Sequence, residues 1–120
     1  MSVITRVISG FVHAVRGLIF VLKFEKNARI HLFSAMVVAI TAILLRMPVD
    51  HFAALMLGVL LVFLAEVINT AIEKTLDLLH PEQNEVVRIV KDISAGAVLI
   101  AALGAFSIGV LVAANYLGWI

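Results

Sequence analysis

The chain has 120 residues, the size of a single domain, and 63% of them are hydrophobic while 14% are charged. Soluble domains are about half apolar and about a quarter charged, so this composition excludes an ordinary soluble domain and indicates an integral membrane protein. With a net charge of only +1, the chain does not show the dense basic face that a nucleic-acid binder needs. Because it has no cysteine, disulfides, thiolate metal sites and cysteine nucleophiles are excluded.

Residues 1–24 have the pattern of an amphipathic helix. On a helical wheel, one face gathers the polar side chains Ser2, Thr5, Arg6, Ser9, His13, Arg16 and Lys23. This pattern predicts a helix that lies in the membrane interface, with its cationic face toward water and headgroups. The alternative is a short fourth span, which the cost of burying basic residues disfavours. Because Arg6, His13 and Arg16 interrupt the apolar run, we expect no cleavable signal peptide.

Three later segments are long and apolar enough to span a membrane, which takes about 20 residues of helix. We place these spans at 29–47, 51–79 and 86–119, within one domain that covers 1–120. Pro81 ends the second span because proline lacks a backbone donor and blocks helix continuation. The expected fold is therefore all-α, with one surface helix and three transmembrane helices. Gly96, Gly104 and Gly109 are expected to let the third span pack closely against its neighbours.

The distribution of lysine and arginine predicts the orientation of these spans. Cationic residues precede the first span and lie between the second and the third, whereas only Arg46 lies between the first and the second. We therefore expect a cytoplasmic N-terminus and a cytoplasmic 74–92 segment. The 46–51 turn and the C-terminus should lie on the opposite side of the membrane.

The second span carries a polar stripe on one face of its helix. Glu66, Asn69, Glu73 and Asp77 follow the helical period, and Glu66 comes directly after the uncharged segment 52–65. An ionisable group at that depth is costly, so the stripe predicts a functional site. For the two acids nearest the helix end the alternative is simple solvation, with Lys74 or Arg88 as the partner. His13 and His31 are more typical of interfacial polar groups than of ligands.

These residue types favour a particular chemistry. A carboxylate at the edge of the hydrocarbon can accept a proton from a hydroxyl, and carboxylates together with phosphate oxygens are usual ligands of Mg²⁺. Arg88 and Lys91 begin the next span at the same membrane level. Together these groups favour transfer of a phosphoryl group onto a lipid hydroxyl. The sequence has no glycine-rich phosphate loop, so a nucleotide would be bound without a soluble nucleotide-binding fold.

Two segments resemble the signature segments of a known family. Residues 66–73 (EVINTAIE) and 91–99 (KDISAGAVL) are similar to those of the prokaryotic diacylglycerol kinase family, which includes undecaprenol kinases, and residues 24–29 (FEKNAR) extend the likeness. The resemblance implies a homotrimeric helical bundle in the bacterial inner membrane, with active sites between subunits at the cytoplasmic face. It implies transfer of the γ-phosphate of MgATP to undecaprenol or diacylglycerol, and residues 25–32 favour undecaprenol.

The resemblance also implies roles for individual residues. Glu66 would be the catalytic base, Glu25 and Glu73 would hold Mg²⁺, and Asn69 would support them. The ATP-binding residues would be Arg6, His13, Glu25, Glu73, Lys91 and Asp92. His13 and the 82–84 loop depart from the family's commonest pattern, which bears on nucleotide selectivity.

The sequence also allows two other interpretations of the polar stripe. In one, the chain is a channel or proton-relay subunit in which Glu66 and Glu73 line a path between packed helices. In the other, the chain is a regulatory membrane peptide that binds a partner helix, and Glu66 would tolerate an apolar replacement.

Overall fold

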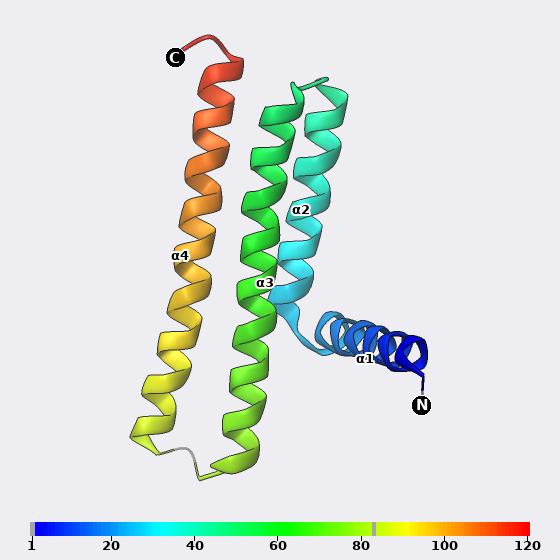
Figure 1. The fold of residues 1–120 in the computed structure, drawn as a ribbon. Coiled ribbons are helices and arrows are strands. Elements are labelled where there is room, and N and C mark those ends of the chain that lie inside the picture. The colour runs from blue at the N-terminus through cyan, green and yellow to red at the C-terminus, as the bar shows by residue number, and fades with distance from the viewer. Residues whose placement is uncertain (1, 83) are drawn as a thin grey trace.

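The computed structural model describes residues 2–82 and 84–120, and these residues form four α-helices. The helices are α1 (Val3–Phe24), α2 (Lys26–Leu44), α3 (Val49–Leu79) and α4 (Glu85–Tyr116). The three later helices run up and down side by side, with α3 between the others, and α1 projects sideways from the start of α2 (Figure 1). The predicted all-helical fold is confirmed.

A single residue turns the chain from α1 into α2. The Glu25 backbone is extended (φ −103°, ψ 117°), although its N–H still bonds to the Val21 carbonyl at 2.8 Å. At the other end of α1, the Ser2 hydroxyl accepts a hydrogen bond from the Thr5 N–H, a typical helix cap. Helix α2 therefore begins at Lys26, three residues before residue 29, where we expect the first span to start, and Glu25 lies at the corner between two helices.

Proline and asparagine set the boundaries of the other two helices. Pro48 immediately precedes α3, after Arg46 takes up the left-handed conformation (φ 51°) that tightens the preceding turn. At its far end α3 stops at Leu79, one residue before the His80–Pro81 pair. The Asn84 side chain then caps α4 by accepting from the Val87 N–H at 3.1 Å.

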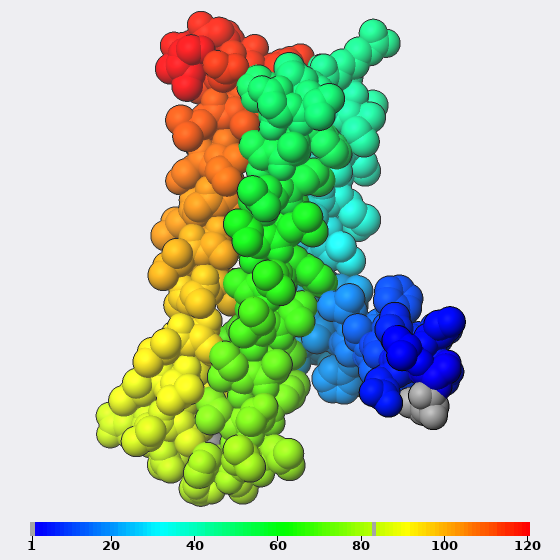
Figure 2. Space-filling view, in the orientation of Figure 1, coloured from blue at the N-terminus to red at the C-terminus, as the bar shows by residue number. Residues whose placement is uncertain are grey.

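The helices differ in how far they extend past the hydrocarbon. α3 has 31 residues and α4 has 32. At about 1.5 Å per residue each helix is about 45–50 Å long, whereas the hydrocarbon core of a membrane is about 30 Å thick. α2 has 19 residues, just enough to cross. The joined ends of α3 and α4 consequently continue beyond the level of α1 (Figure 2). All four helices are long and apolar enough to span a membrane, and α1 differs in its direction.

Burial within the chain is inverted relative to a soluble protein. Large apolar side chains along all four helices are exposed, whereas Glu66, Asn69, Thr70 and Ser94 are buried. Hydrocarbon supplies no hydrogen-bond partners, so polar side chains in a membrane bundle turn inward and apolar ones can face outward. The polar groups of α3 therefore mark the side on which its neighbours lie.

The backbone of α3 comes close to α4 at Gly58. A Cβ at this position would lie 3.3 Å from both the Cα and the Cβ of Ala105. The prediction that Gly96, Gly104 and Gly109 allow close packing is wrong within this chain, since a Cβ at each would meet nothing within 4 Å. Ala105 is the residue of α4 that meets Gly58, and Gly104 and Gly109 line open grooves.

Gly58→Val should push α3 and α4 apart. We expect the free energy of unfolding to fall by roughly 2 kcal/mol, the usual cost of overpacking, measured by detergent-driven unfolding of the micelle-solubilised protein. Gly104→Val is the matched control, because it adds the same side chain where nothing lies within 4 Å. Equal losses in the two variants would contradict the assignment of Gly58.

Candidate active site

Glu66 is buried inside the bundle, with 3% of its surface exposed. It lines an open cavity of about 330 Å³ between α2, α3 and α4. The lining residues are Asn27, His31, Glu66, Asn69, Glu73, Ala95, Val98, Leu99 and Ala102. The predicted stripe thus faces other helices of the protein, and three of its four members share one cavity.

Hydrogen bonds connect residues of the stripe with one another and with α4. The Asn69 amide nitrogen donates to Glu73 Oε1 at 3.0 Å. The Ser94 hydroxyl donates to Asn69 Oδ1 at 2.5 Å, which joins α4 to α3 through two buried side chains. Ser94 was not expected at the site, because the pattern of the third span gave no sign of which of its faces meets the stripe.

α2 contributes Asn27 and His31 to the opposite wall of the cavity. Both interact electrostatically with Glu66. They lie four residues apart and so share a face of the helix. Ala28, which is fully buried, brings this part of α2 against the bundle. His31 was expected to be an interfacial polar group, and Asn27 was not predicted to belong to the site. Their spacing of four residues at the start of a span was the feature of the sequence that could have placed both on one face of the helix.

Glu25 reaches the same region from the corner between α1 and α2. Its Oε1 lies 3.0 Å from the ammonium nitrogen of Lys74, which follows Glu73 on α3. Glu25 and Glu73 are both close enough to Glu66 for their charges to act on it. Glu66 and Glu73 therefore line the cavity, and Glu25 lies beside α3 through its ion pair with Lys74.

The carboxylates of Glu25 and Glu73 suit a Mg²⁺ ion that arrives with a nucleotide. Magnesium usually takes one or two protein carboxylates and completes its shell with water and phosphate oxygens. Among residues 2–82 and 84–120, no three His, Asp or Glu side chains come close enough to form a full protein cage. The donor set consequently fits a metal shared with phosphates better than a structural metal.

Charged pairs occupy the ends of α3 and α4 beyond the cavity. Lys91 of α4 forms an ion pair with Asp77 of α3, a contact that the sequence did not predict for this stripe residue. Arg88 lies 3.6 Å from Asp92 on its own helix. Lys91 and Asp92 thus lie toward the charged end of the hairpin, about one turn from the cavity-lining Ala95.

Two predicted nucleotide contacts are separate from the cavity in a single chain. Arg6 and His13 are exposed on α1, and α1 contributes no residue to the cavity lining. A chain on its own therefore does not bring them to Glu66.

The predicted 82–84 loop connects α3 to α4. Glu82 lies 3.1 Å from the ring nitrogen Nδ1 of His80. A hydrogen bond from its own backbone N–H, together with His80, holds the pKa of Glu82 below its usual value. Asn84 is occupied as the cap of α4, and Gln83 lies outside the described residues.

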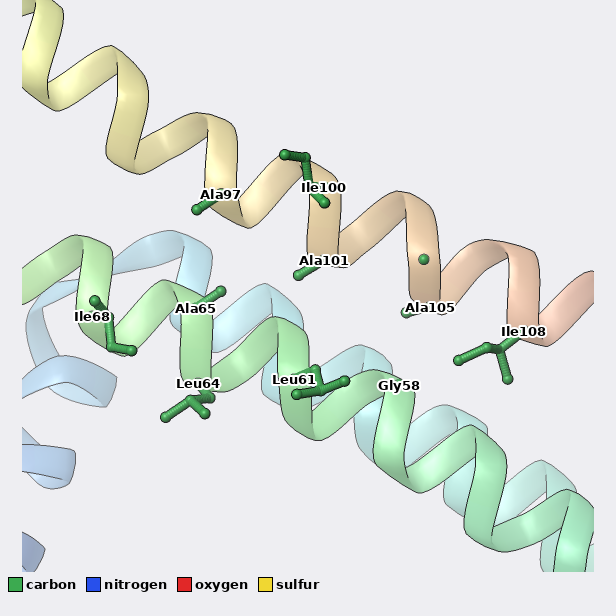
Figure 3. Close-up of a pocket in the computed structure, with 11 residues that line it drawn as sticks. Gly58, Leu61, Leu64, Ala65, Ile68, Ala97, Ile100, Ala101, Ala105 and Ile108 are labelled. Carbon is green, nitrogen blue, oxygen red and sulfur yellow. The ribbon is translucent and has the colours of Figure 1, made fainter.

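A larger groove of about 450 Å³ lies between α3 and α4 and shares no residue with the acidic cavity. Figure 3 shows Ala97, Ala101 and Ala105 on the side of α4 that faces α3, with Leu61 and Ala65 opposite. Its lining residues carry no ionisable side chain, so it offers an apolar surface and no chemistry.

The sequence is similar to those of known proteins. Residues 12–113 match the family model of prokaryotic diacylglycerol kinase. A diacylglycerol kinase of Synechocystis sp. is 37% identical over 101 residues, which cover 83% of this chain and 58% of that protein. An undecaprenol kinase of Bacillus subtilis is 32% identical over 109 residues, which cover 91% of this chain and 89% of that protein. The chain belongs to the prokaryotic diacylglycerol kinase family, a family of lipid kinases.

Proposed function

We propose that this protein transfers the γ-phosphate of ATP to the hydroxyl of a membrane lipid, with Glu66 as the catalytic base. The burial of Glu66 in a cavity lined by polar residues of α2 and α3 and by apolar residues of α4 carries this proposal. Such a cavity suits a lipid with one hydroxyl and a long hydrocarbon chain. Family membership favours this enzyme over a channel subunit or a regulatory peptide.

The residues that line the cavity have different roles in the proposed reaction. The apolar side chains Val98, Leu99 and Ala102 hold the first carbons of the lipid and exclude water. Glu66 accepts the hydroxyl proton as the lipid oxygen forms its bond to the γ-phosphorus, and the bond from that phosphorus to the bridging oxygen of ADP breaks. Asn69 keeps Glu73 oriented through their 3.0 Å hydrogen bond.

The phosphates lie on the water side of Glu66 in this proposal. Glu25 and Glu73 would hold Mg²⁺, which would supply positive charge to offset the negative charge of the ATP phosphates. Lys91 and Asp92 bind the nucleotide near the charged end of the α3–α4 hairpin. Lys74, now paired with Glu25 at 3.0 Å, can keep that carboxylate in place until MgATP arrives.

Undecaprenol is the acceptor that we favour. Residues 25–32 resemble those of undecaprenol-type members, and the relative named undecaprenol kinase aligns with nearly the full length of both chains. A diacylglycerol acceptor is the other candidate, supported by the relative of that name.

The membrane arrangement follows from charge and direction. The cationic face and sideways course of α1 favour a helix on the cytoplasmic membrane surface, and the lysine and arginine pattern favours a cytoplasmic active site. We propose a homotrimer in which α1 of one subunit brings Arg6 and His13 to the site of a neighbour. This arrangement accounts for the distance of α1 from the cavity of its own chain.

An assay with two acceptors tests the function. Purified protein in micelles with MgATP should phosphorylate undecaprenol faster than diacylglycerol, measured with radiolabelled ATP. Glu66→Gln should lower turnover by at least about 100-fold, because a general base is lost. Asp50→Asn makes the same chemical change at the other end of α3 and should leave turnover near that of the parent. An active Glu66→Gln variant would exclude Glu66 as the base.

A magnesium titration tests the two metal ligands. Glu25→Gln and Glu73→Gln should each raise the Mg²⁺ concentration for half-maximal rate by about tenfold, equivalent to about 1.4 kcal/mol of binding free energy. Asp50→Asn again serves as the control. If both variants titrate like the parent, the metal is bound elsewhere.

Mixed trimers test whether subunits share the active site. Arg6→Ala and Glu66→Gln chains should each be impaired alone. After unfolding, mixing and refolding together, activity should recover, because some sites then combine an intact Arg6 with an intact Glu66 from different chains. No recovery would show that each site is built from one chain, and a fully active Arg6→Ala variant would remove Arg6 from the site.

A further inference from the structure

Ser94 is a buried hydroxyl with no role in the mechanism above. Only 8% of its surface is exposed, and its Oγ lies 2.5 Å from Asn69 Oδ1 and 2.9 Å from the Lys91 carbonyl oxygen. A serine hydroxyl has one proton and can donate one strong hydrogen bond at a time. The direction of that bond decides what Ser94 does.

The chemistry of Glu73 determines this direction. The Asn69 NH₂ group donates to Glu73 Oε1 at 3.0 Å, which fixes the orientation of the amide. The amide oxygen of Asn69 then points the other way, toward Ser94. Only a donor satisfies that oxygen, and the Ser94 hydroxyl is such a donor. The Lys91 carbonyl is the weaker competitor, since it lies farther away and belongs to a helix whose backbone already supplies a donor.

We infer that Ser94 is a positioning residue, which holds the Asn69 amide in the one orientation that can donate to Glu73. This inference rests on the proposed function, because it concerns the carboxylate that we assign to Mg²⁺. Ser94 does not touch the reacting atoms. It acts from α4 on an amide of α3, so that the relay Ser94–Asn69–Glu73 makes the metal ligand depend on the packing of the two helices.

Ser94→Ala tests the relay. Without the hydroxyl, the Asn69 amide can rotate, and Glu73 loses its fixed donor. We expect KM for MgATP and the Mg²⁺ requirement to rise by about fivefold to tenfold, the scale of one hydrogen bond, while kcat at saturating MgATP stays close to that of the parent. Ser107→Ala is the matched control: it removes a hydroxyl from the same helix that bonds to the Leu103 carbonyl at 2.8 Å.

Two further variants separate positioning from a general packing role. Ser94→Thr keeps the hydroxyl and should restore the parental KM. In an Asn69→Ala background, Ser94→Ala should have no further effect, since the group through which Ser94 acts is gone. A parental KM in Ser94→Ala, or additive effects in the double variant, would overturn the inference.

A measurement that does not depend on enzyme activity tests this inference separately from the proposed function. In nuclear magnetic resonance spectra of isotope-labelled protein in micelles, the side-chain amide signals of Asn69 should move toward solvated values in Ser94→Ala and stay in place in Ser107→Ala. Unchanged Asn69 signals in Ser94→Ala would overturn the relay even in an active kinase. A parent that phosphorylates neither lipid would instead overturn the proposed function.

Discussion

A carboxylate that lies inside a membrane bundle has to be surrounded by polar partners, and the arrangement of this protein depends on how Glu66 meets that requirement. Hydrocarbon cannot solvate the charge or complete its hydrogen bonds. Glu66 is therefore turned away from lipid, toward Asn27 and His31 on α2 and toward the polar stripe of its own helix. This need places α3 in the middle of the bundle, with a helix on each side.

The position of the cavity at a boundary explains its two kinds of lining. The wall that α4 contributes is apolar, with Leu99 and Ala102 as examples. Toward Leu79, α3 and α4 continue past the hydrocarbon and carry charged pairs such as Lys91–Asp77. Exposed ion pairs of this kind contribute little to stability. Their value in the proposed kinase is to concentrate charge where a water-soluble nucleotide would meet a lipid.

The outer surface of the chain is largely apolar, which is the normal state of a membrane protein facing lipid or other subunits. Within one chain, α3 and α4 come close together at Gly58, where a Cβ would lie 3.3 Å from Ala105, whereas a Cβ at Gly104 would meet nothing within 4 Å. The position of α1, away from the cavity of its own chain, fits an assembly in which surfaces left open here are covered by neighbours.

The sequence by itself determined the features that belong to one helix at a time. Apolar length marked the spans, proline marked their ends, and the helical period put Glu66, Asn69 and Glu73 on one face. The structure confirms that face as the cavity side of α3.

Only the tertiary structure decided which residues of other helices meet that face. The rotation and depth of α2 and α4 bring Asn27, His31 and Ser94 to this face of α3. They also bring Lys91 to Asp77, a pairing between residues 14 positions apart that the sequence did not predict. The glycine at the close helix contact was missed for the same reason. The period of a helix fixes its own faces, but the choice of neighbour depends on how ridges of two helices interlock, and no single helix carries that information.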